Sequence, residues 1–141
     1  MNEKPEEIAL QPGLSTEVEQ IVGKAETAVH MGSGSLAVYA TPALVALMEN
    51  AAVRALEGYL PHGHTTVGGQ IDVRHLEATP VGMKVHAHAE LIEVQGRKIT
   101  FRIQAWDEVE LIGEANHIRF LIEEETFMDK VMSKGSKSQT E

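Results

Sequence analysis

One run of residues, from Thr41 to Tyr59, constrains the fold more than any other part of the chain. It begins with a hydroxyl residue and Pro42, continues through strong helix formers, and meets Gly58 near its end. These signals predict a helix in which Thr41 is the cap and Pro42 is the first helical residue. Its interior is apolar on nearly every side, which is typical of a buried helix. The rest of the chain is then expected to surround it.

The carboxylate of Glu49 lies in the middle of this apolar helix. Burying an isolated charge is costly, so the side chain needs an opposite charge or a polar cavity. A structural role predicts a salt bridge to Arg54 or Arg74, whereas a functional role makes Glu49 part of a site. Both readings stay open at this point.

The segments around the helix change to a period of two, which indicates strands. In the strand expected over residues 65–78, one row of side chains is predicted to face the helix. This row consists of Val67, Gly69, Ile71, Val73 and His75. Gly68, Gln70, Asp72 and Arg74 are predicted on the opposite face. The expected strands cover residues 14–22, 65–78, 83–91, 99–105 and 111–123.

A strand, one long helix and then an antiparallel meander make an α+β arrangement in which the sheet curls around the helix. This layout is a hot-dog fold with about five strands. We expect a flexible leader over residues 1–13, a single hot-dog domain over residues 14–131, and a disordered tail over residues 132–141.

Composition excludes several functions. The 141 residues carry a net charge of −9, which argues against a nucleic-acid surface, and a polyanionic ligand would need a local basic patch. The absence of cysteine removes disulfides, thiolate metal sites and a cysteine nucleophile. No stretch resembles a secretory signal or a membrane span, so a cytoplasmic protein without a membrane partner is expected.

Three residues are candidates for catalysis: Thr41, Glu49 and His75. Thr41 followed by Pro42 also suits an ordinary helix cap, but a hydroxyl and free backbone amides at a helix start suit an oxyanion as well. His75 on an inward row is either a satisfied core residue or an acid/base whose ring a glutamate orients.

Two adjacent glycines, Gly68 and Gly69, weaken a strand unless a bulge or a close approach requires them, so a ligand is expected to pass there. Two histidine pairs have spacing that zinc tolerates, but neither has an identified third ligand. We therefore predict no metal site and no cofactor. The two pairs are His62 with His64 and His86 with His88.

The run from Thr41 through Glu49 to Ala55, with His75 downstream and residues 78–83 after it, resembles the fluoroacetyl-CoA thioesterase group of hot-dog thioesterases. The resemblance covers residues 14–131. The family's threonine, its glutamate eight residues later and its histidine on the following strand correspond to Thr41, Glu49 and His75. Gly68 corresponds to the family's glycine near the acyl group.

The resemblance implies hydrolysis of a small or medium acyl-coenzyme A thioester. Glu49 would be the nucleophile or general base, His75 the acid/base, and Thr41 the hydrogen-bonding partner near the carbonyl. Amides at the helix start beside Pro42, and those of Gly68 and Gly69, would bind the substrate. A homodimer is also implied, with Glu49 and His75 able to come from different chains, and pairing of dimers into a tetramer is left open.

The connector over residues 31–40 is short and rich in glycine and serine, without the longer aromatic lid segment that the resemblance associates with fluoroacetyl specificity. The acyl group is therefore left unassigned. The residues that would meet the coenzyme phosphates are also left open among Arg54, Lys84, Arg97 and Lys98.

Two alternatives keep the fold. A non-catalytic module that binds an acyl-CoA or another acyl ligand predicts that a salt bridge holds the Glu49 carboxylate. A hydratase or dehydratase would use His75 and Glu49 to move water across a double bond, but its usual histidine and aspartate motif is not evident.

Overall fold

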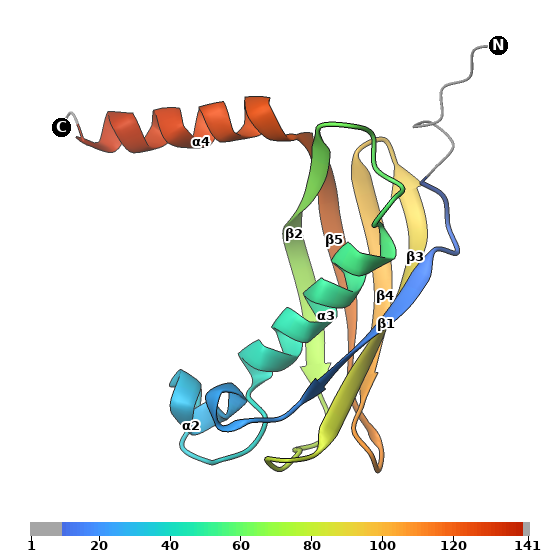
Figure 1. The fold of residues 1–141 in the computed structure, drawn as a ribbon, viewed down its shortest axis with the longest axis vertical. Helices are drawn as coiled ribbons and strands as arrows, with labels where there is room; N and C mark the ends of the chain where they lie inside the picture. The colour runs from blue at the N-terminus through green and yellow to red at the C-terminus, as the bar shows by residue number, and fades with distance from the viewer. Residues whose placement is uncertain (1–9, 140–141) are drawn as a thin grey trace.

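The computed structural model describes residues 10–139. In this part of the chain five strands form one antiparallel sheet in the order β1-β3-β4-β5-β2, and the long helix α3 crosses one face of it (Figure 1). This is the α+β layout that the sequence predicts. The elements are β1 (Ser15–Ile21), η1 (Lys24–Glu26), α2 (Ala28–Met31), α3 (Thr41–Ala55), β2 (His64–His75), β3 (Lys84–Gln95), β4 (Lys98–Trp106), β5 (Leu111–Glu123) and α4 (Glu124–Gln139).

The start of α3 differs in one detail from the prediction. Ala40, whose backbone is extended, occupies the cap position, and no side chain caps the helix there. Thr41 is already helical, which places Pro42 one residue later than expected, still within the first turn where proline is tolerated. The hydroxyl of Thr41 is therefore not used as a helix cap.

Helix α3 packs one face, not its whole circumference, against the sheet. Residues near its start and on its outer side, such as Ala46, Asn50 and Arg54, are exposed. Alternate residues of β3 and β4 point at the helix and are fully buried, as their period-two pattern predicts. The core of helix and sheet includes Leu44, Met48, Ala51, Ala52, Val85, Ala87, Ala89, Leu91, Ile99, Phe101, Ile103 and Ala105.

A bulge in β2 corrects the predicted faces of that strand. The pairing with β5 shifts between Gly68 and Gln70, so Gly69 has no partner in the register. Because one inserted residue reverses the alternation, Thr66 and Gly68 lie on the helix side before the bulge, as does His75 after it. The prediction that Val67 and Gly69 face the helix was wrong, since the pattern was extended through the bulge without a shift.

The C-terminal helix α4 follows β5 directly and extends beyond the β2 edge of the sheet (Figure 1). It continues to Gln139, so the structure differs from the irregular tail expected from residue 132. Most of the expected leader, residues 1–9, lies outside the described residues. No helix between residues 10 and 139 is long and apolar enough to cross a membrane.

Candidate functional site

Thr41 and His75 meet at the start of α3, as the sequence predicts. The Thr41 hydroxyl oxygen Oγ1 lies 2.8 Å from Nδ1 of His75. Thr41 is exposed in the first turn of the helix, and His75 is the last residue of β2. The fold thus joins a hydroxyl and an imidazole that are 34 residues apart in the chain.

The other ring nitrogen of His75, Nε2, is buried and has no hydrogen-bond partner among residues 10–139. Burial lowers the pKa of His75 from its ordinary value, and the nearby backbone of Glu77 only partly opposes this. The ring is therefore neutral at pH 7. A neutral imidazole with one nitrogen held by a hydroxyl and the other unpartnered can accept or donate a proton.

Glu49 lies two turns along α3 from Thr41 and belongs to a second group of side chains. Its Oε2 accepts a hydrogen bond from Nη1 of Arg119 at 3.3 Å, and its side chain is 40% exposed. The structural alternative named Arg54 or Arg74 as the partner. Arg54 instead lies 4.0 Å from Glu57, so the predicted partners were wrong because the true one is 70 residues away.

Arg119 is fixed by the inner face of the sheet. Its Nε donates to Oγ1 of Thr66 at 2.9 Å, and its Nη2 donates to the Thr66 carbonyl at 3.1 Å. These two hydrogen bonds orient the planar guanidinium so that its remaining nitrogen, Nη1, points at Glu49. Burial lowers the pKa of Arg119, while the neighbouring Glu49 charge opposes that shift.

His117, which is almost fully buried, completes this second group. Its Nδ1 lies 2.7 Å from the Gln70 carbonyl, which can only accept, so Nδ1 carries the proton. Its Nε2 is then free to accept from Nη1 of Arg119 at 3.1 Å. Burial and the Arg119 charge lower the pKa of His117, against the Gln70 bond and Glu49, so the ring is neutral beside the ion pair.

The two glycines of β2 have different surroundings. A β-carbon added to Gly68 would lie 2.6 Å from Oε2 of Glu49, whereas one added to Gly69 would collide with the ring of Phe120. The missing side chain at Gly68, but not at Gly69, therefore leaves room for the Glu49 carboxylate beside the strand. Gly69 is the bulge residue and lies against Phe120.

The three predicted catalytic residues form two neighbouring groups. Within the described residues no hydrogen bond or ion pair joins Glu49 to His75. Thr41 and Glu49 are eight residues apart on α3, about 12 Å along its axis. Pro42 is exposed beside Thr41, at the helix end where free amides are available.

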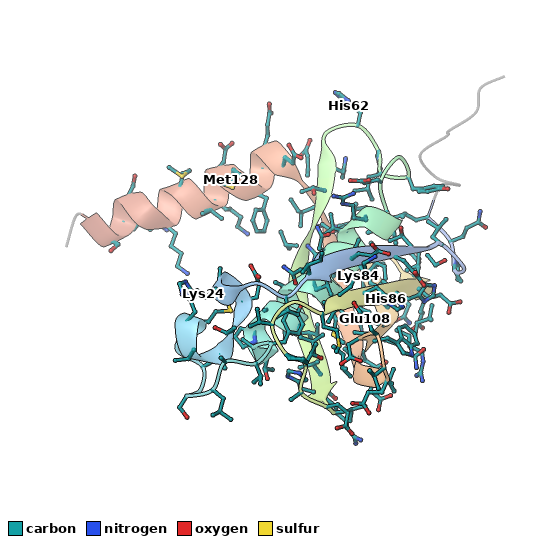
Figure 2. The ribbon with its side chains drawn as sticks, turned by 60° about the horizontal axis from the view of Figure 1, so that its bottom comes forward. Lys24, His62, Lys84, His86, Glu108 and Met128 are labelled. Atoms are coloured by element: carbon teal, nitrogen blue, oxygen red, sulfur yellow. The ribbon has the colours of Figure 1, made fainter. Side chains whose placement is uncertain are left out.

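The histidine pairs lie apart from both groups. His62 is at the tip of the loop before β2 and points away from the body, whereas His86 lies on β3 and stacks on Trp106 (Figure 2). His64 contacts the His62 carbonyl through Nδ1 at 3.0 Å. Among residues 10–139 no three histidine, cysteine, aspartate or glutamate side chains gather around a possible metal position.

Sequence reasoning did not find Thr66, His117 or Arg119. The available signal was on the last strand, where two basic residues follow Ala115 at a spacing of two and so share its inward row. A buried cation such as Arg119 needs an opposite charge, and Glu49 was the carboxylate without an identified partner on a helix predicted to be buried. The two could therefore have been considered as a pair from the sequence.

The chain was compared with known proteins. A sequence model of the family described as "FlK: Fluoroacetyl-CoA-specific thioesterase" matches residues 22–125. A fluoroacetyl-CoA thioesterase from Streptantibioticus cattleyicolor is 44% identical over 97 residues, which cover 69% of this chain and 70% of the relative.

Solved structures agree in fold. A mutant of the fluoroacetyl-CoA-specific thioesterase FlK superimposes with a TM-score of 0.83 at 36% identity, over 89% of this chain and 97% of FlK. A FlK mutant in complex with fluoroacetate and CoA gives a TM-score of 0.79 at 35% identity, over 84% and 99% of the two chains. A Thermus thermophilus member of the thioesterase superfamily shares the fold, with a TM-score of 0.87 at 23% identity, over 93% and 97%. These likenesses confirm the predicted hot-dog fold and the predicted resemblance, and the chain belongs to the fluoroacetyl-CoA-specific thioesterase family.

Proposed function

We propose that the chain is an acyl-CoA thioesterase that hydrolyses a small or medium acyl thioester to the free acid and CoA, using Thr41, Glu49 and His75. The observation that carries the assignment of residues is the hydrogen bond between Thr41 and His75, which leaves Nε2 of His75 buried without a partner. Thr41 and His75 both line a hollow at the start of α3, where a bound thioester would lie beside the hydroxyl–imidazole pair. The family's fluoroacetyl-CoA thioesterase supports the reaction class.

In the proposed reaction, Glu49 either attacks the thioester carbonyl carbon directly or removes a proton from the water that attacks it. Either attack produces a tetrahedral oxyanion, which the Thr41 hydroxyl and the amides at the start of α3 stabilise. Collapse of this intermediate breaks the carbon–sulfur bond and releases the CoA thiolate. When water has attacked, the free acid forms in the same step; when Glu49 has attacked, an acyl–Glu49 anhydride remains, and water hydrolyses it to the free acid and the Glu49 carboxylate. His75 accepts a proton that the attacking water releases and donates it to the leaving sulfur, a role that suits its neutral ring.

The pairing of Glu49 with Arg119 is what the non-catalytic binding module predicts. The contact involves a single carboxylate oxygen, Oε2, and the Glu49 side chain keeps 40% of its surface exposed. A carboxylate held from one side in this way is oriented while its other oxygen stays available. We therefore favour the enzyme.

We also propose a homodimer with the site between the subunits. Strand β2 is 12 residues long and is at the edge of the sheet, where a strand of a second chain could pair with it. Pairing of two β2 strands across a twofold axis would bring Glu49 of one chain toward His75 of the other. Such a dimer would explain why Glu49 and His75 of the same chain do not contact each other. Assembly into tetramers and a cytoplasmic location stay predictions.

The test is thiol release from a panel of short, branched, aromatic and fluorinated acyl-CoA thioesters. Glu49→Gln and His75→Ala are each expected to lower turnover by on the order of a hundredfold or more. Lys24→Gln, on η1 and outside the site, is the control. Unchanged turnover in both variants would remove the proposed site, and retained binding of acyl-CoA without any release would favour the binding module.

A further inference from the structure

Helix α4 contacts the rest of the described chain mainly near its start. Its first residue is held to the loop before β2, where the backbone N–H of Glu124 donates to the Gly63 carbonyl at 2.9 Å. Phe127 is half-buried, but every residue over 128–138 is exposed. A helix of 16 residues is marginal in water without a surface to pack on, and Gly135 weakens this one further. The helix therefore needs a partner surface.

The exposed part of α4 combines apolar side chains with lysines. Val131 and Met132 are 43% and 65% exposed, and together with Met128 they form an apolar stripe at helical spacing. Lys130 and Lys134 border a hollow along the helix that residues of α4 itself line. The acidic residues of α4 all precede Lys130, so the half of the helix that lies farther from the sheet is basic. Such a surface suits a partner that is both apolar and acidic.

A surface of this kind lies at the opposite end of the same sheet. The turn between β4 and β5 carries Val109, which is 74% exposed, between the exposed Glu108 and Glu110. The neighbouring turn between β2 and β3 exposes Leu76 and Val81. Figure 1 shows α4 at the top of the sheet and both turns at its bottom. Helix α4 therefore cannot cover these turns within one chain.

The β2 pairing proposed above brings the two surfaces together. Within one chain, α4 follows the end of β5, which pairs with the start of β2 through His64 opposite Glu123. Because a twofold axis normal to the sheet makes the two β2 strands antiparallel, the start of β2 lies beside the end of the partner's β2. The partner's turns after β2 and after β4 then lie at the same edge of the joined sheet as α4. Helix α4 extends beyond β2 at that edge, toward the place of the partner (Figure 1).

The length of α4 fits this arrangement. Strands lie about 4.8 Å apart, so the partner's turn between β4 and β5 would be about 14–19 Å from β5 of the first chain. The 16 residues of α4 span about 24 Å, and Lys134 lies about 15 Å from the start of the helix. The basic half of α4 would therefore reach the partner's acidic turn.

We infer that α4 of each chain docks on a second copy of this chain, across the turns that follow β2 and β4 of that copy. The apolar stripe packs on the partner's Leu76 and the partner's Val109, and Lys134 lies beside the partner's Glu110. The inference rests on the β2-paired dimer of the proposed function, and goes beyond it by assigning a role to α4.

This docking makes α4 part of the partner's candidate site. Leu76 and Glu77 line the same hollow as Thr41 and His75. A helix seated on the partner's Leu76 forms one side of that hollow, so the site is complete only in the dimer.

The test uses the absence of cysteine from the chain. In the full-length variant Val109→Cys/Met132→Cys, mild oxidation is expected to give a covalent dimer on a non-reducing gel, and peptide mass mapping should find residue 109 linked to residue 132. The matched control is Ile92→Cys/Met132→Cys, because Ile92 is also exposed but lies toward the opposite end of β3 from the docking turns. The control should form no link between residues 92 and 132.

Charge exchange tests the same contact without a cross-link. Lys130→Glu/Lys134→Glu should raise the Kd of the dimer in sedimentation by on the order of tenfold, because like charges then face each other. Adding Glu108→Lys/Glu110→Lys to the same chain should restore the wild-type Kd. Added salt should reduce the difference between the first variant and the wild type.

The outcomes separate this inference from the proposed function. A dimer that lacks the link between residues 109 and 132, or whose Kd is unchanged by charge reversal, would overturn the docking of α4 and leave β2 pairing and the enzyme in place. A monomeric wild type would overturn the docking and the dimer together, whereas thiol release by that monomer would still support the enzyme. Binding of a monomeric wild type to anionic lipid vesicles that is lost in Lys130→Glu/Lys134→Glu would assign α4 to a lipid surface instead.

Discussion

Gly68 of β2 lies so close to Glu49 of α3 that a β-carbon at position 68 would come within 2.6 Å of the carboxylate oxygen Oε2. The same β-carbon would lie 3.3 Å from Nη1 of Arg119. The carboxylate, the guanidinium and the glycine therefore occupy one tightly packed contact. Any side chain on this residue competes with the ion pair for the same space.

The variant Gly68→Ala should displace the Glu49 side chain and lower turnover by on the order of tenfold to a hundredfold, since a misplaced catalytic group loses its alignment. Gly69→Ala is the matched control. Its β-carbon meets the partly exposed ring of Phe120, which can rotate, so the effect on turnover should be smaller. Thiol release and the Tm of both variants would be measured, and equal losses of turnover would contradict a special role for Gly68.

Arg119→Lys should lower both stability and activity. A lysine cannot reproduce the hydrogen bonds to Thr66 while also reaching Glu49 and His117. The loss of buried hydrogen bonds is expected to lower the free energy of unfolding by about 1–3 kcal/mol. Urea unfolding measures this directly, with Arg54→Lys on the exposed side of α3 as the control. A variant as stable as the wild type would show that the guanidinium network contributes little.

The main elements of this fold could be predicted because each carries its own local signal. Helix α3 has good helix formers between Thr41 and Gly58, and β3 and β4 have clean alternation, so local preference and burial agree. The bulge at Gly69 broke the alternation of β2, and a pattern with period two cannot show where one residue is skipped. The pairing of Glu49 with Arg119 joins residues 70 positions apart, so it depends on the register between β2 and β5.

The meeting of Thr41 with His75 was accessible to sequence reasoning because one residue starts the helix and the other ends an inward row. That reasoning also assumed a single group with Glu49. A carboxylate two turns along a helix is separated from the first turn by the rise of the helix itself. The contact between chains that would bridge this distance leaves no local pattern in either element.

Thr41→Val tests whether the hydroxyl acts on His75 or on the helix. Since Ala40 occupies the cap position, loss of the hydroxyl should change the Tm little while turnover falls, because Nδ1 of His75 loses its partner. Thr41→Ser keeps the hydroxyl and should restore most of the turnover. A fall in Tm without a fall in turnover would instead show that Thr41 serves the helix alone.

The pH dependence of activity follows from His75. Its pKa is lowered below the ordinary value near 6.5, chiefly by burial, so the neutral ring persists to a lower pH than in a free histidine. The acidic limb of the profile of kcat/KM is therefore expected below pH 6.5, and in the His75→Ala variant that limb should be absent from the residual activity. A limb above pH 6.5 that survives in His75→Ala would assign the titration to another group.

Stability should also fall in acid through His75 and His117. Both have a folded-state pKa below the unfolded value, so the unfolded chain binds more protons as the pH decreases from 6.5 toward the folded-state values. Their neutral forms favour the folded state fully above pH 6.5, and this advantage is lost at lower pH. Chemical unfolding of His117→Gln between pH 7 and 5 should show a shallower decline than the wild type, and an equal slope would contradict the assignment.

The proposed site between two subunits gives the last prediction. If Glu49 of one chain acts with His75 of the other, a mixed dimer of Glu49→Gln and His75→Ala chains contains one intact site and one site that lacks both groups. Each variant alone is nearly inactive, but refolding an equal mixture should restore about a quarter of wild-type turnover, because half of the dimers are mixed and each has one good site. Each variant refolded alone, and the two variants mixed without refolding, serve as controls. Recovery that appears only after subunit exchange would assign the two residues to different chains, whereas no recovery from a mixture shown by light scattering to be dimeric would place both residues of each site in one chain.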